Sequence, residues 1–445
     1  MQLRIFALLF CVLLTVFVAM TLGTLAQTIA DSSNWPMYHN DAAAHTGYSD
    51  TPTPTSAPQL WKCTIDTEPV TIPGSPAIVD GRVYLGSGDN NVYCFNAMSG
   101  VKMWSYPTEN YASAAPAVID GHVYIGSADG TIYCLDASSG TQIWNSSIRQ
   151  NQSGGGSAGF SPTVVGELVY VESEQGNVYC LNSADGSKVW NYTTGANALN
   201  AAPAAKGGYV YAGNNQGDVF CLNDTDGSEI WNFTTGGAVH SPTVANGFVY
   251  VGSADGNVYC LLASDGSKVW NYTTEYNSNG PAHGYSWGNA VSDPAVAGGY
   301  VYVGSSDFKI YCLNATSGSY FWNYTTNAEV YSAPAVADGL VFVGSYDGNA
   351  YCLNATDGVE VWNYQVGTFS PVNAAGSAGS SSIADGVVYV VGNGVLYALG
   401  TSSTATALPS YLNAIIIVAV FVVAAVVAVV LLKRKHQSNP NRPFS

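Results

Sequence analysis

Few side chains in this sequence have the types and spacing that catalysis or metal binding requires. His39, Asp41 and His45 share one short segment, and histidine combined with carboxylate suits a transition-metal ion. Three ligands on a single segment form a loose pattern, and a latch segment that packs on the folded domain explains them more simply. We therefore predict no metal site.

Other constellations are weaker still. Asp-Gly pairs recur but lack the dense carboxylate spacing of calcium loops, so they indicate hairpin turns in which glycine has a positive φ. No Ser-His-Asp order, nucleophile elbow or phosphate loop is evident, although paired carboxylates that meet only in three dimensions stay an open alternative. The Asp-Gly pairs are Asp129-Gly130, Asp255-Gly256 and Asp347-Gly348.

One repeated unit carries most of the chain. It reads small-Pro-Ala-Val, then Gly-x-Val-Tyr-x-Gly-Ser, then Asp-Gly-x-x-Tyr-Cys-Leu, then x-x-Gly-x-x-x-Trp. Successive units begin 39 to 52 residues apart, and each holds four short apolar runs typical of strands. Eight four-stranded units of this length predict an all-β fold, an eight-bladed β-propeller with four-stranded blades over residues 60–400.

The two ends of the repeat array indicate how the ring closes. The eighth unit stops at Tyr397-Ala398-Leu399 without a tryptophan strand, while an orphan strand around Trp61 precedes the first unit. We predict that this N-terminal strand completes the last blade, which removes free sheet edges. Residues 27–59 are then the latch segment. The eight tryptophan strands contain Trp61, Trp104, Trp144, Trp190, Trp231, Trp270, Trp322 and Trp362.

The stretch from Cys134 to Trp144 resembles the tryptophan-docking motif of propellers of the pyrroloquinoline-quinone (PQQ) type, and similar stretches end at six other tryptophans. The N-terminal Asn34-Trp-Pro-Met-Tyr-His-Asn-Asp41 also resembles the signature of secreted members of this family. The resemblance implies the propeller and a structural docking role for the tryptophans. It leaves function open, because the family includes PQQ-dependent alcohol dehydrogenases, an outer-membrane assembly scaffold without a cofactor, and many surface proteins.

A quinone with three carboxylates needs several Arg or Lys residues near one end of the channel. Arg149 is the only arginine in a link from an outer to an inner strand, and no lysine lies there. The adjacent Cys-Cys pair of the PQQ alcohol dehydrogenases is also missing. We therefore expect no cofactor, with PQQ and calcium as the alternative, and we consider an enzymatic role the less favoured interpretation.

Seven of the nine cysteines occupy one repeated position on the predicted third strands. Equivalent positions in neighbouring blades lie farther apart than the roughly 7 Å between Cα atoms that a disulfide allows. We therefore predict small buried thiols beside the docking tryptophans, with Cys63 outside the set and free. The seven are Cys94, Cys134, Cys180, Cys221, Cys260, Cys312 and Cys352, and the eighth unit has Ala398.

The chain termini predict a membrane protein. Residues 1–26 have a secretory signal pattern, with Arg4 before an apolar run. Residues 412–432 are apolar and long enough to cross a bilayer, and Lys433 to Lys435 follow at once, which predicts a cytoplasmic tail over 433–445. Residues 401–411 form a polar linker. The expected location is the cell membrane, single-pass, with the propeller outside.

Glycosylation sequons are abundant and mark surface sites if the host uses them. Five of them directly follow a tryptophan and so fall on outermost strands. Together with the signal pattern, the basic tail and the acidic ectodomain, they resemble archaeal surface proteins. The candidate residues are Asn145, Asn151, Asn191, Asn223, Asn232, Asn271, Asn314, Asn323 and Asn354.

Three longer spacings between repeats come from insertions at 149–160, 275–290 and 366–379. All three are links from an outer strand to the next inner strand, so they share one face, which we name the top; insertions on one face often mark a binding face. The chain leaves blade eight on the opposite, bottom face. Candidate ligand contacts on the top are Tyr111, Phe160, Asn200, His240, His283, Tyr285, Trp287 and Tyr331.

Charge limits the partners. All 30 acidic but only eight of the 13 basic residues lie between Asp31 and Asp385, which gives this stretch a net charge of −22. Such a field repels nucleic acid and disfavours anionic ligands. We predict a non-catalytic extracellular binding or scaffold module for a cell-envelope protein or glycan, of undetermined oligomeric state. The alternatives are a PQQ-binding oxidoreductase and a purely structural surface-layer component.

Overall fold

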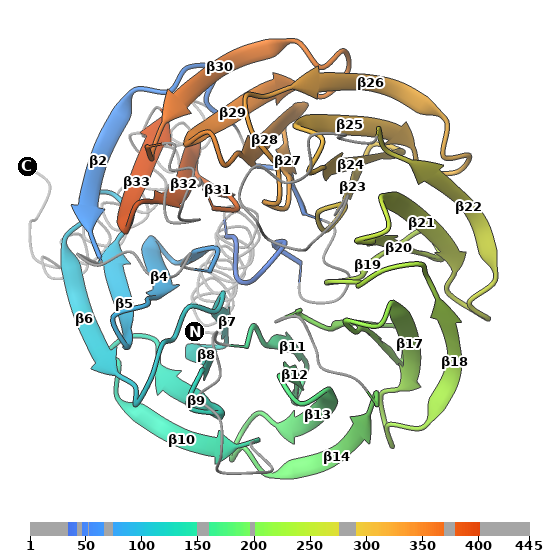
Figure 1. Ribbon diagram of the computed structural model, residues 1–445. Helices are drawn as coiled ribbons and strands as arrows, with labels where there is room; N and C mark the ends of the chain where they lie inside the picture. Colours follow the sequence, from blue (N-terminus) through green and yellow to red (C-terminus); the bar gives the residue numbers. More distant parts are fainter. Residues whose placement is uncertain are drawn as a thin grey trace, which may run out of the picture. The chain divides into compact units, whose positions relative to one another are not determined.

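The computed structural model describes residues 34–41, 47–51, 53–65, 74–148, 160–195, 201–275, 291–368 and 379–400. They form eight antiparallel blades around a central axis (Figure 1), which confirms the predicted all-β, eight-bladed propeller with four-stranded blades. Within these ranges no helix is long and apolar enough to cross a bilayer. The segments predicted at 1–26, 401–411, 412–432 and 433–445 lie outside the described residues.

Every blade runs from a short inner strand to an outer strand at the rim. Blade one contains β3 (Ala77–Val79), β4 (Arg82–Gly86), β5 (Asn91–Asn96) and β6 (Lys102–Pro107). Blade two contains β7 (Ala117–Ile119), β8 (His122–Ser127), β9 (Thr131–Asp136) and β10 (Gln142–Ser147). Blade three contains β11 (Thr163–Val165), β12 (Leu168–Ser173), β13 (Asn177–Asn182) and β14 (Lys188–Thr193). Blade four contains β15 (Ala204–Lys206), β16 (Tyr209–Gly213), β17 (Asp218–Asn223) and β18 (Glu229–Thr234).

The second half of the ring repeats this order, with additions from the N-terminal segment. Blade five contains β19 (Thr243–Ala245), β20 (Phe248–Gly252), β21 (Asn257–Leu262) and β22 (Lys268–Thr273). Blade six contains β23 (Ala295–Ala297), β24 (Tyr300–Gly304), β25 (Lys309–Asn314) and β26 (Tyr320–Thr325). Blade seven contains β27 (Ala335–Ala337), β28 (Leu340–Gly344), β29 (Asn349–Asn354) and β30 (Glu360–Gln365), and β1 (Tyr48–Ser49) lies beside β27. Blade eight contains β31 (Ser382–Ala384), β32 (Val387–Gly392), β33 (Val395–Gly400) and β2 (Gln59–Thr64).

The hydrophobic core lies between the blades. The second and third strands are buried on both faces, because each blade is packed between two neighbours, and their sequences are accordingly almost continuous runs of Val, Tyr, Cys and Leu. Tyr124 and Trp144 of blade two, for example, share a core cluster with Val169 of blade three. The repeated apolar pattern therefore records blade-to-blade packing.

The outer strands are the exposed rim of the ring. In blade three the register shifts between Lys188 and Trp190, so that Val189 is an extra, bulged residue, and all eight outer strands have the same shift before their tryptophan. Bulges twist an edge strand and hinder pairing with another chain. The rim is thus protected against edge-to-edge association.

Each docking tryptophan links its blade to the next one. The indole N–H of Trp190 donates to the Asp224 carbonyl at 2.8 Å, and the ring covers Gly227, where an added Cβ would lie 2.5 Å from the indole. The other seven indoles donate in the same way at 2.8 to 3.1 Å. Trp362 donates to Pro54, so the N-terminal segment supplies the acceptor where the chain of blade eight is interrupted.

The N-terminal strand closes the ring as predicted. β2 pairs antiparallel with β33, with Trp61 opposite Ala398 and Lys62 opposite Tyr397. Blade eight is therefore built from both ends of the propeller sequence, and it gains a tryptophan strand that its own repeat lacks.

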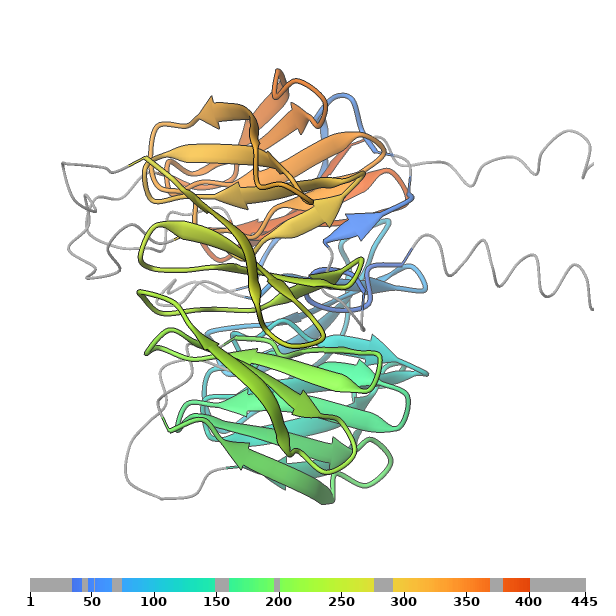
Figure 2. The same ribbon diagram turned by 90° about the vertical axis from the view of Figure 1, so that its right-hand side faces the viewer.

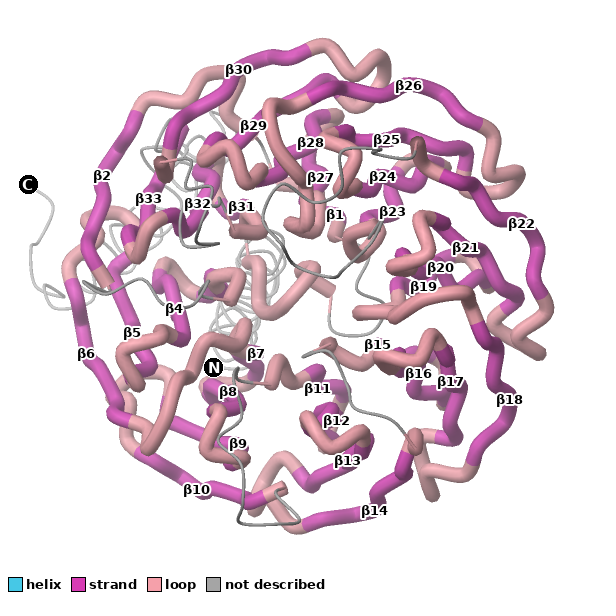
Figure 3. The backbone as a smooth tube through the Cα atoms, in the orientation of Figure 1, coloured by secondary structure: helices cyan, strands magenta, loops and turns pink. Residues whose placement is uncertain are grey.

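The described part of the latch segment lies against the inner strands, where Figure 3 shows β1 beside β27. Trp35 exchanges two backbone hydrogen bonds of 2.7 Å with Ile78 of blade one, and the Pro36 carbonyl accepts from Val118 of blade two. β1 then pairs parallel with β27 of blade seven, with Tyr48 opposite Val336. The latch thus joins blades on both sides of the closure point from inside the ring.

Strand direction divides the turns and links between two faces, which Figure 2 shows with the ring seen from its side. The top face holds the links from outer to inner strands and the turns between second and third strands. The bottom face holds the turns between first and second and between third and fourth strands. β33 runs from top to bottom, so Gly400 ends on the bottom face.

Candidate functional site

The structure spreads the predicted top-face contacts around the ring. Tyr111, His240 and Tyr331 lie in the links that lead into blades two, five and seven, and all three side chains are half-buried. Phe160 is only 4% exposed and joins the core cluster between blades two and three. The other four candidates, Asn200, His283, Tyr285 and Trp287, lie outside the described residues.

Tyr331 is part of a local aromatic group. Its ring meets that of Tyr346 edge-on, with centroids 5.1 Å apart, and the Tyr346 N–H donates to the carbonyl of the buried Glu329 at 2.9 Å. The Tyr331 hydroxyl is buried without a hydrogen-bond partner among the described residues. Burial, with the nearby charge of Glu329, raises the pKa of Tyr331.

A carboxylate tie recurs in the top-face turns. In blade two, Asp129 accepts from the Thr131 N–H at 2.8 Å and from the Tyr133 hydroxyl at 2.9 Å. Its second oxygen also accepts from the Glu109 N–H of the preceding link at 3.3 Å. Gly130 has a φ of 82°, and the other two predicted Asp-Gly turns also have positive φ, which confirms them as hairpin turns. Equivalent aspartate-tyrosine pairs are Asp89-Tyr93, Asp255-Tyr259, Asp307-Tyr311 and Asp347-Tyr351.

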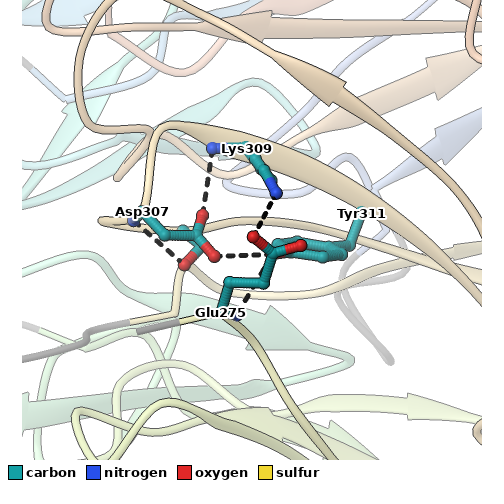
Figure 4. Close-up of polar contacts among 5 residues, drawn as sticks. Glu275, Asp307, Lys309 and Tyr311 are labelled. Carbon is teal, nitrogen blue, oxygen red and sulfur yellow. Dashed lines mark hydrogen bonds and ion pairs between the residues drawn. The ribbon is translucent and has the colours of Figure 1, made fainter. Parts of the chain in front are cut away.

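Figure 4 shows this tie in blade six, where a lysine joins it. Asp307 accepts from the Tyr311 hydroxyl at 2.6 Å and from the Lys309 backbone N–H at 3.0 Å. The Lys309 ammonium forms an ion pair with Glu275 at 2.5 Å, and the Glu275 N–H donates to the Tyr311 hydroxyl at 3.2 Å. The positive charge of Lys309 is therefore already matched by a carboxylate.

Charges are distributed unequally between the faces. Of the seven Lys and Arg residues in the described ranges, Lys309 alone lies in a top-face turn or link. Five lie at strand ends on the bottom face: Arg82, Lys102, Lys188, Lys206 and Lys268. Acidic residues of the described top-face turns and links are Asp89, Glu109, Asp129, Glu174, Asp218, Asp255, Glu275, Asp293, Asp307, Glu329 and Asp347.

The latch contacts a half-buried carboxylate, that of Asp293, just before the inner strand of blade six. The Tyr38 hydroxyl donates to Asp293 at 2.6 Å, and the Ser241 N–H donates to the other Asp293 oxygen at 3.1 Å. Burial and the charge of Asp293 raise the pKa of Tyr38 well above its usual value. Three other links use serine to accept the equivalent backbone N–H: Ser161, Ser241 and Ser380. Asp293 replaces the serine of the other links and, besides the backbone N–H, accepts a hydrogen bond from Tyr38 of the latch segment.

Glu172 is a second exception to the repeat. It lies near the top end of β12, at a position that is glycine in six of the other seven blades and Val391 in blade eight. An added Cβ on Gly213, the counterpart in blade four, would approach the His240 carbonyl to 2.6 Å. Its side chain is 1% exposed. The Gly213 N–H lies near it, but neither carboxyl oxygen makes a hydrogen bond of normal geometry with a described residue. Burial raises the pKa of Glu172 well above its usual value, and the negative charge of Asp293 adds to this increase. Aligning the eight repeats would have found it, because Val-Glu-Ser replaces Val-Gly-Ser.

The described residues of the top face do not suit an anionic cofactor. A tricarboxylate such as PQQ requires converging cations, but Lys309 is paired with Glu275, and the top side of the ring also contains the buried Glu172 and Glu329 and the half-buried Asp293. Arg149 lies outside the described ranges.

The described residues also contain no group of three or more His, Cys, Asp or Glu side chains arranged to hold a metal ion. His39 is buried and stacks on Tyr38, whereas His45 is not described.

The cysteines of the third strands are buried free thiols, and none of the described cysteines is in a disulfide. Cys180 is fully buried and lies opposite Trp190 on the neighbouring strand. Burial raises its pKa to about 12, which suppresses thiolate formation. Cys63 is half-buried on the outer strand of blade eight, and burial raises its pKa to about 11.

The described sequons fall into two structural groups. Asn145, Asn191, Asn232 and Asn271 are exposed on outer strands, and Asn323 is half-buried at the same position. Asn151 is outside the described residues. The remaining sequon residues lie in bottom-face turns, where each side-chain oxygen accepts from the N–H of the sequon threonine: Asn223, Asn314 and Asn354.

Comparisons with known proteins agree on the architecture. A family model described as "Outer membrane protein assembly factor BamB" matches residues 53–272 and 274–407. No curated protein sequence matches the chain. BamB from Moraxella catarrhalis is 17% identical, with a TM-score of 0.60 over 78% of this chain and 100% of that one.

Two dehydrogenase structures are similar at the same level. The quinohemoprotein alcohol dehydrogenase from Comamonas testosteroni is 14% identical, with a TM-score of 0.66 over 83% of this chain and 81% of that one. A europium-containing methanol dehydrogenase is 15% identical, with a TM-score of 0.63 over 82% and 90%. Likeness at these identities shows the fold alone, and it does not choose between scaffold and enzyme. The family match covers most of the sequence, and the chain therefore belongs to the PQQ-like, BamB-type β-propeller repeat family.

Proposed function

We propose that this protein is a non-catalytic binding or scaffold module that uses the top face of its propeller to hold a protein or glycan of the cell envelope. The observation that carries the proposal is the top face itself, whose described turns and links offer a single lysine that is already paired with Glu275. A face of this kind suits recognition of a macromolecule and is unsuited to an anionic redox cofactor. The family description as an assembly factor supports the same role.

The proposal includes a membrane anchor with the propeller outside the cell. It is supported by the signal pattern at 1–26, the apolar stretch at 412–432 and the basic residues that follow. Since Gly400 ends on the bottom face, that face would lie toward the membrane and the top face would be presented outward. Glycans on the outer-strand sequons would coat the rim, as on archaeal surface proteins, and leave the top face open.

A quinone titration tests the non-catalytic role. Purified protein is incubated with PQQ and calcium and separated from free quinone, and bound quinone and alcohol-dependent dye reduction are measured. We expect neither, because the described top-face residues provide no free cation for the three carboxylates. Stoichiometric quinone binding with dye reduction would contradict the proposal and support a quinoprotein oxidoreductase.

Membrane extraction tests the anchor. We expect the full-length protein to stay with membranes in alkaline carbonate and a chain ending at residue 401 to be released. Release of the full-length protein under the same conditions would contradict the proposed anchor. Mass analysis of tryptic peptides that contain Asn191, one of the exposed outer-strand sequons, would show whether the rim carries glycans.

A further inference from the structure

The top face carries an almost complete ring of carboxylates. Seven of the eight blades have an acidic residue in or directly beside the turn between the second and third strands, and blade eight has Asn393. The ring consists of Asp89, Asp129, Glu174, Asp218, Asp255, Asp307 and Asp347. A ring of one charge sign focuses the field above the centre of the face and raises the local concentration of oppositely charged groups.

Hydrogen bonds hold the six aspartates of this ring in place without neutralising them. Asp255, for example, accepts from the Tyr259 hydroxyl at 2.7 Å and from the Gly236 N–H at 2.8 Å, and both donors are uncharged. Only blade six adds a cation, and Lys309 is matched by Glu275, as Figure 4 shows. The negative charge of the ring is therefore fixed in position and largely uncompensated, which is the arrangement that electrostatic recognition uses.

Glu172 supplies an independent observation that points to a ligand. A buried carboxyl group normally has hydrogen-bond or charge partners, because burying it without them is costly. Glu172 has no cation beside it among the described residues, and the Gly213 N–H, although near, does not reach either carboxyl oxygen with normal hydrogen-bond geometry. It occupies the top end of β12, where most repeats have glycine. The Asp293 carboxylate, itself held by Ser241 and Tyr38, adds further negative potential at this position.

We propose that the top face docks a cationic partner, a Lys- or Arg-rich protein segment, and that Glu172 accepts one of its ammonium or guanidinium groups. This inference rests on the proposed binding function and specifies the chemistry of the partner. An anionic partner would be repelled by the ring, and a neutral glycan would leave Glu172 without a counter-charge. A Lys or Arg side chain fits both the acidic ring and Glu172, because the ring attracts its positive charge and its N–H groups can donate hydrogen bonds to the Glu172 carboxylate.

The test uses a fluorescently labelled octalysine peptide as the probe and the full-length protein in detergent. We expect saturable binding that weakens between 50 and 300 mM salt, since exposed charges are screened, and no binding of an octaglutamate peptide. Glu172→Gln, which keeps the side-chain shape, should weaken octalysine binding about tenfold or more, the scale expected when one partner of a buried charge pair is lost. The double variant Glu109→Gln/Glu174→Gln, in two top-face residues, should weaken it by about threefold.

A matched control separates this site from general attraction to an acidic protein. Asp226→Asn/Asp265→Asn removes two exposed charges from the bottom face and should change octalysine affinity by less than about twofold. Equal weakening by top-face and bottom-face variants, unchanged binding by Glu172→Gln, or no octalysine binding at all would overturn the inference. Each of those results would still be compatible with a binding module whose partner is not cationic. Quinone binding with dye reduction would instead contradict the proposed binding function itself.

Discussion

The blades pack closely where each docking tryptophan covers a glycine of the next blade. At Gly227 an added Cβ would lie 2.5 Å from Cε3 and 2.7 Å from Cδ2 of Trp190, and φ is +71°. Gly247, in a bottom-face turn, has a φ of +81° but no atom within 4 Å of an added Cβ. Alanine at either site is strained by the positive φ, at a cost of about 1 kcal/mol, so the pair isolates the effect of the tryptophan contact.

We expect Gly227→Ala to be the more destabilising change. The added methyl group displaces the indole, and such overpacking costs about 1–3 kcal/mol. The displacement also weakens the 2.8 Å hydrogen bond from Trp190 to the Asp224 carbonyl, which contributes about 1 kcal/mol. The free energy of unfolding should thus fall by about 2 kcal/mol more in Gly227→Ala than in Gly247→Ala. Urea unfolding followed by tryptophan fluorescence measures both variants. Equal losses of stability would refute the docking role of the tryptophan.

Three further predictions concern individual side chains. Because the pKa of Glu172 is raised in the folded state, its protonated form stabilises the protein at low pH, and this contribution is lost as pH rises through the folded-state pKa. The melting temperature of Glu172→Gln relative to wild type should therefore increase from pH 4.5 to pH 8, and a difference that stays constant over this range would contradict the assignment. Tyr192→Phe removes a hydrogen bond to Glu229 of the next blade and should lower the free energy of unfolding by about 1 kcal/mol. Tyr272→Phe, which has no carboxylate acceptor at the corresponding position of the next blade, should lower it less. Equal losses would count against a stabilising role of the Tyr192–Glu229 hydrogen bond. In the native protein, a thiol reagent at pH 8 should modify the half-buried Cys63 before the buried cysteines of the third strands, and all of these cysteines should react after denaturation. Rapid modification of a third-strand thiol in the native state would contradict this and would show that the contacts between blades open.

The repeated residues made the fold predictable from sequence. A tryptophan, a glycine and a small buried thiol recur once per unit because every blade makes the same contacts with its neighbour, so eight copies report one geometry. The missing tryptophan of the last repeat and the orphan Trp61 strand likewise predicted ring closure, which β2 and β33 confirm. The Asp-Gly turns were predicted correctly, but their links to a tyrosine four residues later were not recognised, although the fixed spacing was present in five repeats.

The rest of the candidate site depended on contacts that have no local signature. The two-residue β1 pairs with β27 across more than 280 residues of sequence, and no pattern in Tyr48 or Ser49 indicates that partner. The position of Asp293 against Tyr38 follows from the same placement of the latch. Glu172 differed from its seven counterparts in the sequence, but its significance required the burial and the missing partners that only the fold reveals.

In-cell photocrosslinking tests the central claim, that this propeller holds an envelope partner by its top face, most directly. A photoreactive amino acid replaces either Tyr111 on the top face or Tyr209, which is 38% exposed on the bottom face, and crosslinked products are identified by mass spectrometry. We predict one discrete product from Tyr111, rich in Lys or Arg at the crosslinked segment, and none in common from Tyr209. The same product from both positions, or a product from Tyr209 alone, would contradict the account.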